Sequence, residues 1–134
     1  MKPKILLRAA AVLMLLHTIG HTFGALGWAK APNTKVAAVI SGMQNEHFDF
    51  MGRSVTLAQF YIGYGISMIL ILLYFSLQLW LLAISPTRPM LLLTALLLSG
   101  LAVCEYVYFF PFAALFTAIA AACTWLSFKQ LPQP

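Results

Sequence analysis

Two histidines lie four residues apart inside the first long apolar segment of this chain, where a lipid-facing sequence would avoid them. His17 and His21 fall within residues 5–28, and this spacing places both imidazoles on one face of a helix. An ionisable side chain inside a membrane is costly, so it usually faces a protein interior, a cavity or a partner. The chemistry open to the pair is metal or haem ligation, proton transfer, or hydrogen bonding between helices.

A carboxylate lies in the third apolar segment, residues 90–110. At the helical rise, Glu105 is roughly 22 Å and His21 roughly 24 Å from the ends at which their segments enter the membrane. This similar depth predicts that the two side chains lie on facing helices, within hydrogen-bonding or one-water distance. The other candidate site residues come from the first loop and the start of the second segment: His47, Arg53, Gln59, Tyr61 and Tyr64.

Three interpretations of these polar residues remain open. In the first, Glu105 pairs with a histidine or with Arg53 and only specifies how the helices pack. In the second, a metal ion is bound by a set drawn from His17, His21, His47 and Glu105, because imidazole and carboxylate are common metal ligands. Haem would require His47, because two histidines on one face of a helix cannot bind opposite faces of one haem.

The third interpretation is a pocket for a small molecule, a quinone or a proton. Aromatic side chains with a few polar groups are typical of ligand pockets. The same aromatic residues are more typical of the belt that membrane proteins form at the edge of the bilayer. The residues concerned are Tyr61, Tyr64, Tyr106, Tyr108, Phe109 and Phe110.

Composition places these residues in a membrane protein. The chain has 134 residues, of which 62% are hydrophobic and 8% charged, far from the average of soluble domains. The net charge of +5 does not indicate nucleic-acid binding, because the basic residues cluster at the ends of the apolar segments. Cys104 and Cys123 fall at different depths of their segments, so we expect no disulfide between them.

The apolar segments predict an all-α fold: a bundle of four transmembrane helices in a single integral membrane domain, residues 1–134. The expected helices cover residues 5–28, 55–84, 90–110 and 112–128, and prolines separate the last three. A stripe of apolar residues with helical spacing predicts a short amphipathic helix over residues 36–50 in the first loop. Asn33 or Thr34 would cap its start, and Asp49 and Arg53 would form an i,i+4 pair on its polar face.

The basic residues predict the orientation. With four spans both termini lie on one side, which holds five basic residues, whereas the first loop, residues 29–54, holds three. The positive-inside rule therefore predicts cytoplasmic termini and an outer first loop. The five are Lys2, Lys4, Arg8, Arg88 and Lys129, and the three are Lys30, Lys35 and Arg53.

Three short motifs resemble those of a group of small, uncharacterised bacterial inner-membrane proteins with four helices. The motifs are Gly20-His21, Phe48-x-Phe50-x-Gly52-Arg53-Ser54, and Phe60-Tyr61-x-Gly63-Tyr64-Gly65. The resemblance covers about the first half of the chain, and it implies the four-span topology and the bacterial inner membrane. It carries over no catalytic residue. Gln59 departs from the pattern, because similar sequences often have an acidic residue near this position.

We therefore expect a small membrane protein of the binding or accessory type, with an outward-facing His/Glu pocket for a metal, a proton or a lipid-like ligand. The alternative is a small membrane enzyme or a redox subunit that uses the same residues with a metal or haem. The expected partners are the lipid bilayer and either a membrane protein or a second copy of the chain. The sequence assigns no catalytic residue and no definite cofactor.

Overall fold

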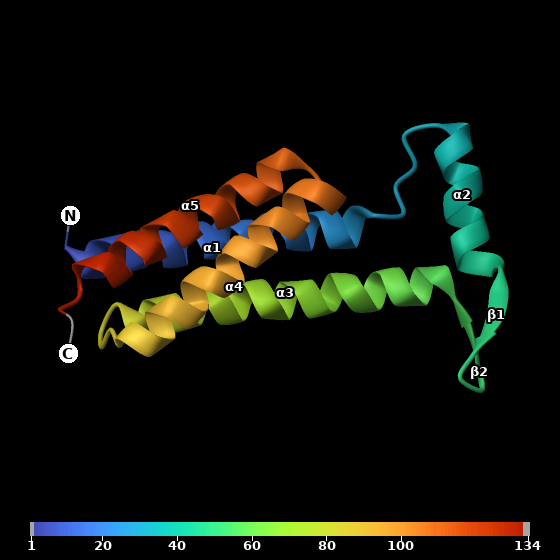
Figure 1. The fold of residues 1–134 in the computed structure, drawn as a ribbon. Helices are drawn as coiled ribbons and strands as arrows, with labels where there is room; N and C mark the ends of the chain where they lie inside the picture. Colours follow the sequence, from blue (N-terminus) through green and yellow to red (C-terminus); the bar gives the residue numbers. More distant parts are fainter. Residues whose placement is uncertain (1, 133–134) are drawn as a thin grey trace. The chain divides into compact units, whose positions relative to one another are not determined.

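The computed structural model describes residues 2–132 and shows five helices and one β-hairpin in them (Figure 1). The all-α fold predicted from the sequence is confirmed. Four of the helices are long and apolar enough to cross a membrane. The elements are α1 (Pro3–Gly27), α2 (Thr34–Asn45), β1 (His47–Phe50), β2 (Arg53–Thr56), α3 (Leu57–Leu82), α4 (Arg88–Tyr108) and α5 (Pro111–Gln130).

The ends of the long helices follow from proline. Pro89 and Pro111 lie in the first turns of α4 and α5, where a missing backbone N–H leaves no intrahelical hydrogen bond unmade. The sequence predicted only residues 112–128 for the last helix, but α5 has 20 residues. At 1.5 Å per residue this is roughly 30 Å, which matches the hydrocarbon core of a bilayer.

The segment between α1 and α3 differs from the expectation. Asn33 caps α2 as predicted, because its side chain accepts a hydrogen bond from the Val36 N–H at 3.0 Å. However, α2 ends at Asn45, and β1 pairs antiparallel with β2 from His47↔Thr56 to Phe50↔Arg53. The short helix predicted in this loop is therefore confirmed as α2, but its expected extension to residue 50 and the helical Asp49–Arg53 pair are wrong.

Two consecutive residues with positive φ explain the hairpin. Met51 has φ 51° and Gly52 has φ 80°. A two-residue turn with positive φ at both positions matches the right-handed twist of two antiparallel strands. The hairpin continues to Thr56, so α3 begins at Leu57, two residues later than predicted.

The chain divides into two compact units, each described here by itself. The bundle unit comprises Met1–Ile19 and Ile71–Pro134, and the loop unit comprises Gly20–Leu70. In the bundle unit α4 and α5 run side by side (Figure 1). Hydroxyl groups connect other helices there: Ser76 donates to the Ala11 carbonyl at 2.9 Å and Ser127 to the Pro3 carbonyl at 3.4 Å. Its fully buried large apolar side chains are Leu7, Met14, Leu72, Leu79, Leu91 and Leu98.

Aromatic contacts and a helix cap organise the loop unit. Phe48 and Phe50, on one face of β1, lie 6.1 and 5.2 Å from the ring of Phe60 in α3. The Thr56 N–H donates to Gln59 Oε1 at 3.1 Å, and the Gln59 N–H donates to Thr56 Oγ1 at 3.3 Å. This reciprocal pair is a capping box, which satisfies two free N–H groups where α3 begins.

Candidate functional site

Three helices of the bundle unit bring an imidazole, a carboxyl and a hydroxyl group together. His17 Nε2 of α1 lies 3.8 Å from Glu105 Oε1 of α4. The other ring nitrogen, Nδ1, lies 3.1 Å from the hydroxyl oxygen of Thr117 in α5. We call these three residues the His17–Glu105–Thr117 cluster. Both ring nitrogens of His17 face a polar group of the cluster: Nε2 faces Glu105 and Nδ1 faces Thr117.

The helix lengths explain why these three residues meet. His17 follows the start of α1 by roughly 21 Å, and Glu105 follows the start of α4 by roughly 26 Å. Because α5 returns from the far end of α4, Thr117 is roughly 9 Å from that end. In helices of about 30 Å, all three positions fall at a similar level, nearer the α4–α5 turn than the chain termini.

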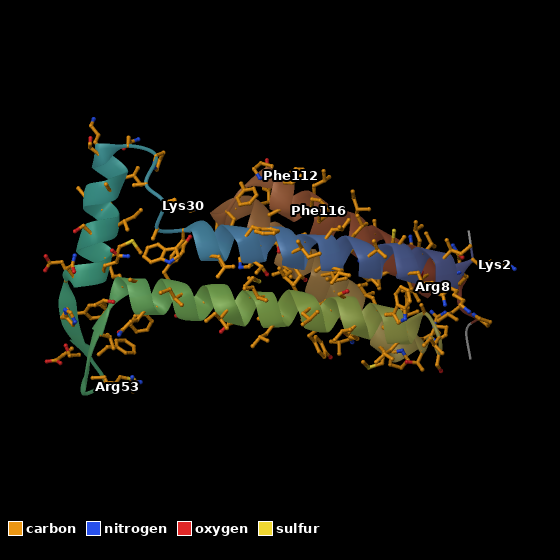
Figure 2. All side chains as sticks on the ribbon, turned by 180° about the vertical axis from the view of Figure 1, so that it is seen from behind. Lys2, Arg8, Lys30, Arg53, Phe112 and Phe116 are labelled. Carbon is orange, nitrogen blue, oxygen red and sulfur yellow. The ribbon has the colours of Figure 1, made fainter. Side chains whose placement is uncertain are left out.

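The cluster is shielded from solvent. The exposed fraction is 7% for His17, 3% for Glu105 and 0% for Thr117. The Phe116 ring lies 6.0 Å from the imidazole and makes an edge contact with Phe112 at 5.2 Å. Figure 2 shows Phe112 and Phe116 along α5. A surrounding of low polarity strengthens the electrostatic interaction inside the cluster and raises the cost of any group left unpaired.

Glu105 is incompletely satisfied. Its Oε2 atom is buried and has no hydrogen-bond partner among residues 2–132, and the 3.8 Å between Oε1 and His17 is too long for a direct hydrogen bond. A carboxyl group with one oxygen beside a base and one oxygen unpaired can carry a proton. It can equally accept a donor from a water molecule or a small ligand.

His17, and not the predicted His21, is the partner that the structure gives to Glu105. His21 belongs to the loop unit and is half-buried, and its Nε2 atom has no hydrogen-bond partner in the described chain. An estimate of depth from residue counts does not distinguish His17 from His21. One helical turn separates the two histidines by roughly 6 Å, which is within the uncertainty that helix tilt adds to a count from the membrane edge.

The other candidate residues have local roles in the loop unit. Gln59 caps α3, as described above. The His47 Nδ1–H donates to the Asn45 carbonyl at 2.9 Å. Tyr61 packs on Trp28 at 5.1 Å, and Tyr64 lies 6.4 Å from the Phe60 ring. Arg53 is exposed on β2. Among the described residues of the loop unit only Val55, Thr56 and Ala58 are buried, so this unit has no comparable buried cluster.

Metal ligation stays a prediction. Among residues 2–132, no three side chains of His, Cys, Asp or Glu are grouped closely enough to hold one ion. His17 and Glu105 form a pair that Thr117 completes with a hydroxyl group. A hydroxyl is a weaker metal ligand than a third imidazole or carboxylate, so this set fits a proton better than a metal ion.

Thr117 was not among the site residues predicted from the sequence. It is a hydroxyl-bearing residue in an alanine-rich segment, and the buried face of α5 carries it between small residues: Ala113, Ala114, Ala120 and Ala121. The signal that was available is the helical spacing of Thr117, Thr124 and Ser127 along that face. Threonine often bonds to its own helix, as Thr124 does to the Ala120 carbonyl at 2.8 Å, so the spacing alone does not identify the residue that contacts a histidine.

Comparison with known proteins adds no family to this geometry. A scan of protein families, a search of curated proteins and a search of solved structures each find no match to the chain.

Proposed function

We propose that this protein is a membrane protein of the binding or accessory type that binds a proton at the His17–Glu105–Thr117 cluster. The observation that carries the proposal is the buried His17–Glu105 pair with one carboxyl oxygen unpaired. The proposal places the protein in a bacterial inner membrane with cytoplasmic termini, so that the cluster lies in the outer half of the bilayer. The apolar helices support the membrane environment, and the basic residues at the chain ends support the orientation.

The cluster can hold the proton in two arrangements. When His17 is protonated and Glu105 ionised, their attraction offsets part of the cost of burying two charges. When both are neutral, that cost disappears, and hydrogen bonding to Thr117 remains. Both arrangements hold the same proton and have the same net charge, so the proton can move between His17 and Glu105 without changing that charge. Loss of this proton, or uptake of a second one, changes the net charge buried among α1, α4 and α5. The proton state is thereby coupled to the packing of these helices.

Infrared difference spectroscopy tests the proposal. We expect a pH change to produce a carboxyl band in protein reconstituted in lipid nanodiscs, and Glu105→Gln to remove it. Glu46→Gln is the matched control, because Glu46 is exposed in the loop unit, and it should leave the band unchanged. A spectrum without a carboxyl band that depends on Glu105 would contradict proton binding there.

The same purified protein separates the proposal from its redox alternative. A proton-binding protein should be colourless and free of stoichiometric metal when purified without chelator. A haem band or one metal ion per chain, lost in His17→Leu, would overturn the proposal and favour a redox subunit. Elemental analysis and an ultraviolet–visible spectrum give both results.

Cysteine labelling tests the orientation. In a background with Cys104 and Cys123 replaced by alanine, Asn33→Cys lies before α2 and Ser85→Cys lies between α3 and α4. A membrane-impermeant maleimide should label Asn33→Cys in intact spheroplasts and Ser85→Cys only after the membrane is opened. The reverse pattern would place the termini outside.

A further inference from the structure

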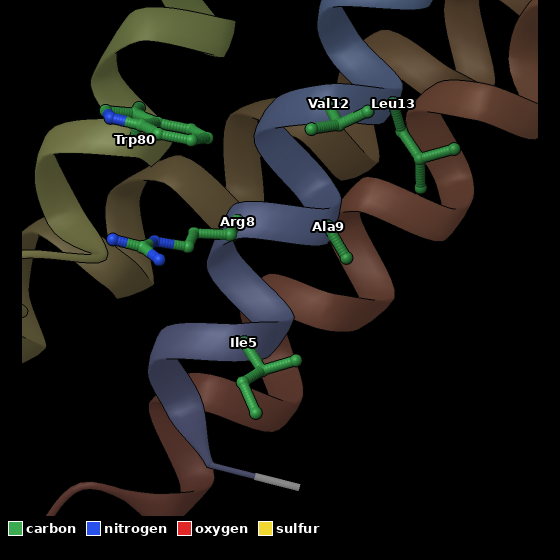
Figure 3. A pocket seen from close by; sticks show the side chains of 6 residues that line it. All are labelled: Ile5, Arg8, Ala9, Val12, Leu13 and Trp80. Carbon is green, nitrogen blue, oxygen red and sulfur yellow. The ribbon is translucent and has the colours of Figure 1, made fainter.

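A shallow apolar groove lies on the exposed surface of the bundle unit, and none of its lining residues belongs to the cluster. It has a volume of about 610 Å³ and is open on one side. Figure 3 shows one charged side chain, Arg8, among apolar ones, with the Trp80 ring as a wall. The groove is lined by Ile5, Arg8, Ala9, Val12 and Leu13 of α1 and by Trp80 of α3.

Arg8 is held in this groove by an aromatic ring. Its guanidinium carbon lies 5.3 Å from the centre of the Trp80 ring, a cation–π contact that fixes the group without using its N–H donors. The one ion pair within residues 2–132 is His17–Glu105, so no carboxylate of the described chain neutralises Arg8.

Arg88 provides a contrast at the same end of the bundle unit. Its guanidinium lies 4.5 Å from the Phe128 ring but also donates to the carbonyl of Leu131 at 2.7 Å and to that of Pro132 at 3.4 Å. Arg88 therefore already donates hydrogen bonds within the chain. No hydrogen bond from the guanidinium of Arg8 is found among residues 2–132, so its five N–H donors are available to an anion at the groove.

The charge around the groove favours a negatively charged occupant. Lys2 and Arg8 lie at the N-terminal end of the chain (Figure 2), and Lys4 lies between them in the sequence. The acidic residues lie elsewhere: Glu46 and Asp49 in the loop unit, and Glu105 in the cluster. Arg8 is roughly 8 Å from the start of α1. The 25 residues of α1 span more than the roughly 30 Å of the hydrocarbon core, so its first turns can reach the lipid headgroups.

We propose that this groove binds one anionic phospholipid. The guanidinium of Arg8 receives the phosphate, and the acyl chain lies along Val12 and Leu13. Ala9 leaves room for the acyl chain because its side chain is a single methyl group. The indole of Trp80 has the amphipathic character that favours the boundary between headgroups and acyl chains. Basic side chains in pockets between transmembrane helices bind anionic headgroups, and Arg8 is the basic side chain of this groove.

Fluorescence quenching by brominated lipids tests this site. In a variant with Trp28→Phe and Trp125→Phe, Trp80 is the single tryptophan. We expect brominated phosphatidylglycerol to quench it with about fivefold higher apparent affinity than brominated phosphatidylcholine, the effect of one basic residue near an anionic surface. Arg8→Gln should abolish the preference, and Arg8→Lys should retain part of it.

Lys4→Gln is the matched control, because it removes one charge from the same end of α1 without altering the groove. It should keep the preference. Native mass spectrometry of the chain with all three tryptophans gives a second readout, in which phosphatidylglycerol should remain bound at higher collision energy than phosphatidylcholine. Equal quenching and equal retention of the two lipids would overturn the proposal. So would equal losses in Lys4→Gln and Arg8→Gln, which would indicate a diffuse charge effect.

Discussion

The bundle unit and the loop unit each contain part of α1 and part of α3, but they differ in whether polar side chains are buried. In the bundle unit, polar groups are buried on facing helices, as in the His17–Glu105–Thr117 cluster. Among the described residues of the loop unit, burial is confined to the end of β2 and the first turn of α3, at Val55, Thr56 and Ala58. An apolar helix therefore becomes a site only where neighbouring helices cover its polar residues, and hydropathy alone does not show where that happens.

Core packing within the bundle unit gives the largest expected effect. Leu79 is fully buried, whereas Leu81, two residues later on the same helix, is 65% exposed. We expect Leu79→Ala to lower the free energy of unfolding by about 2.7–5 kcal/mol, because it leaves a cavity. The matched variant Leu81→Ala should change it by less than about 0.5 kcal/mol. Unfolding in mixed micelles measures both values, and equal losses would show that α3 is not packed as the structure places it.

The two histidines of α1 sharpen the comparison, because they lie on either side of the boundary between the units. His17→Leu removes the partner of a buried carboxyl group, so we expect it to lower the free energy of unfolding by about 1–3 kcal/mol. His21→Leu should have little effect.

The double variant His17→Leu with Glu105→Leu identifies the cause. Replacing both members of a buried pair by apolar residues should recover much of the loss, because no polar group then stays unpaired. Unfolding experiments on the three variants form the test. Losses that simply add would mean that His17 and Glu105 do not interact.

Thr117 provides a smaller effect within the bundle unit. Thr117→Val keeps the shape but removes the hydroxyl that contacts His17 Nδ1, so we expect a loss of about 1 kcal/mol. Thr124→Val is the control, because that hydroxyl bonds to its own helix at the Ala120 carbonyl. In NMR spectra of the labelled protein, Thr117→Val should shift the His17 ring nitrogens and Thr124→Val should not. Identical spectra for the two variants would remove Thr117 from the cluster.

The smallest expected effect is in the loop unit. Gln59→Leu breaks the capping box, so the first turn of α3 should lose about 0.5–1 kcal/mol of local stability. Gln59→Glu should preserve the turn, because a carboxylate also accepts the Thr56 N–H. Hydrogen exchange at the first residues of α3 measures the change. Equal protection in both variants would show that Gln59 does not cap the helix.

Most of the fold could be predicted from the sequence, because long apolar segments and prolines define the spans and their ends. The hairpin could not. Methionine at a positive φ is rare, so Met51-Gly52 carries no ordinary turn signal. Phe50 continues the helical stripe of Val36, Ile40, Met43 and His47, whereas Phe48 and Phe50 together have the alternation of a strand, so the pattern fits both structures.

The site was predicted in part. Glu105 and His17 were both candidates from their chemistry, and the pairing of Glu105 with His21 came from a depth estimate too coarse to separate residues one turn apart. The contact of Thr117 with His17 depends on the angle at which α5 faces α1, and no local sequence pattern fixes that angle. Gln59 was considered for chemistry, whereas its spacing of three from Thr56 was the signal of a capping box.

The most direct test of the central claim is a pH titration by NMR, with labelled histidine and glutamate, of the protein in lipid bilayers. His17→Leu and Glu105→Gln identify the resonances, and His21 serves as an internal reference. If the cluster shares a proton, the His17 ring nitrogens and the Glu105 carboxyl carbon should change at one common midpoint, and Glu105→Gln should move that of His17 while leaving that of His21. Separate midpoints, or a His17 transition that ignores Glu105→Gln, would contradict the account.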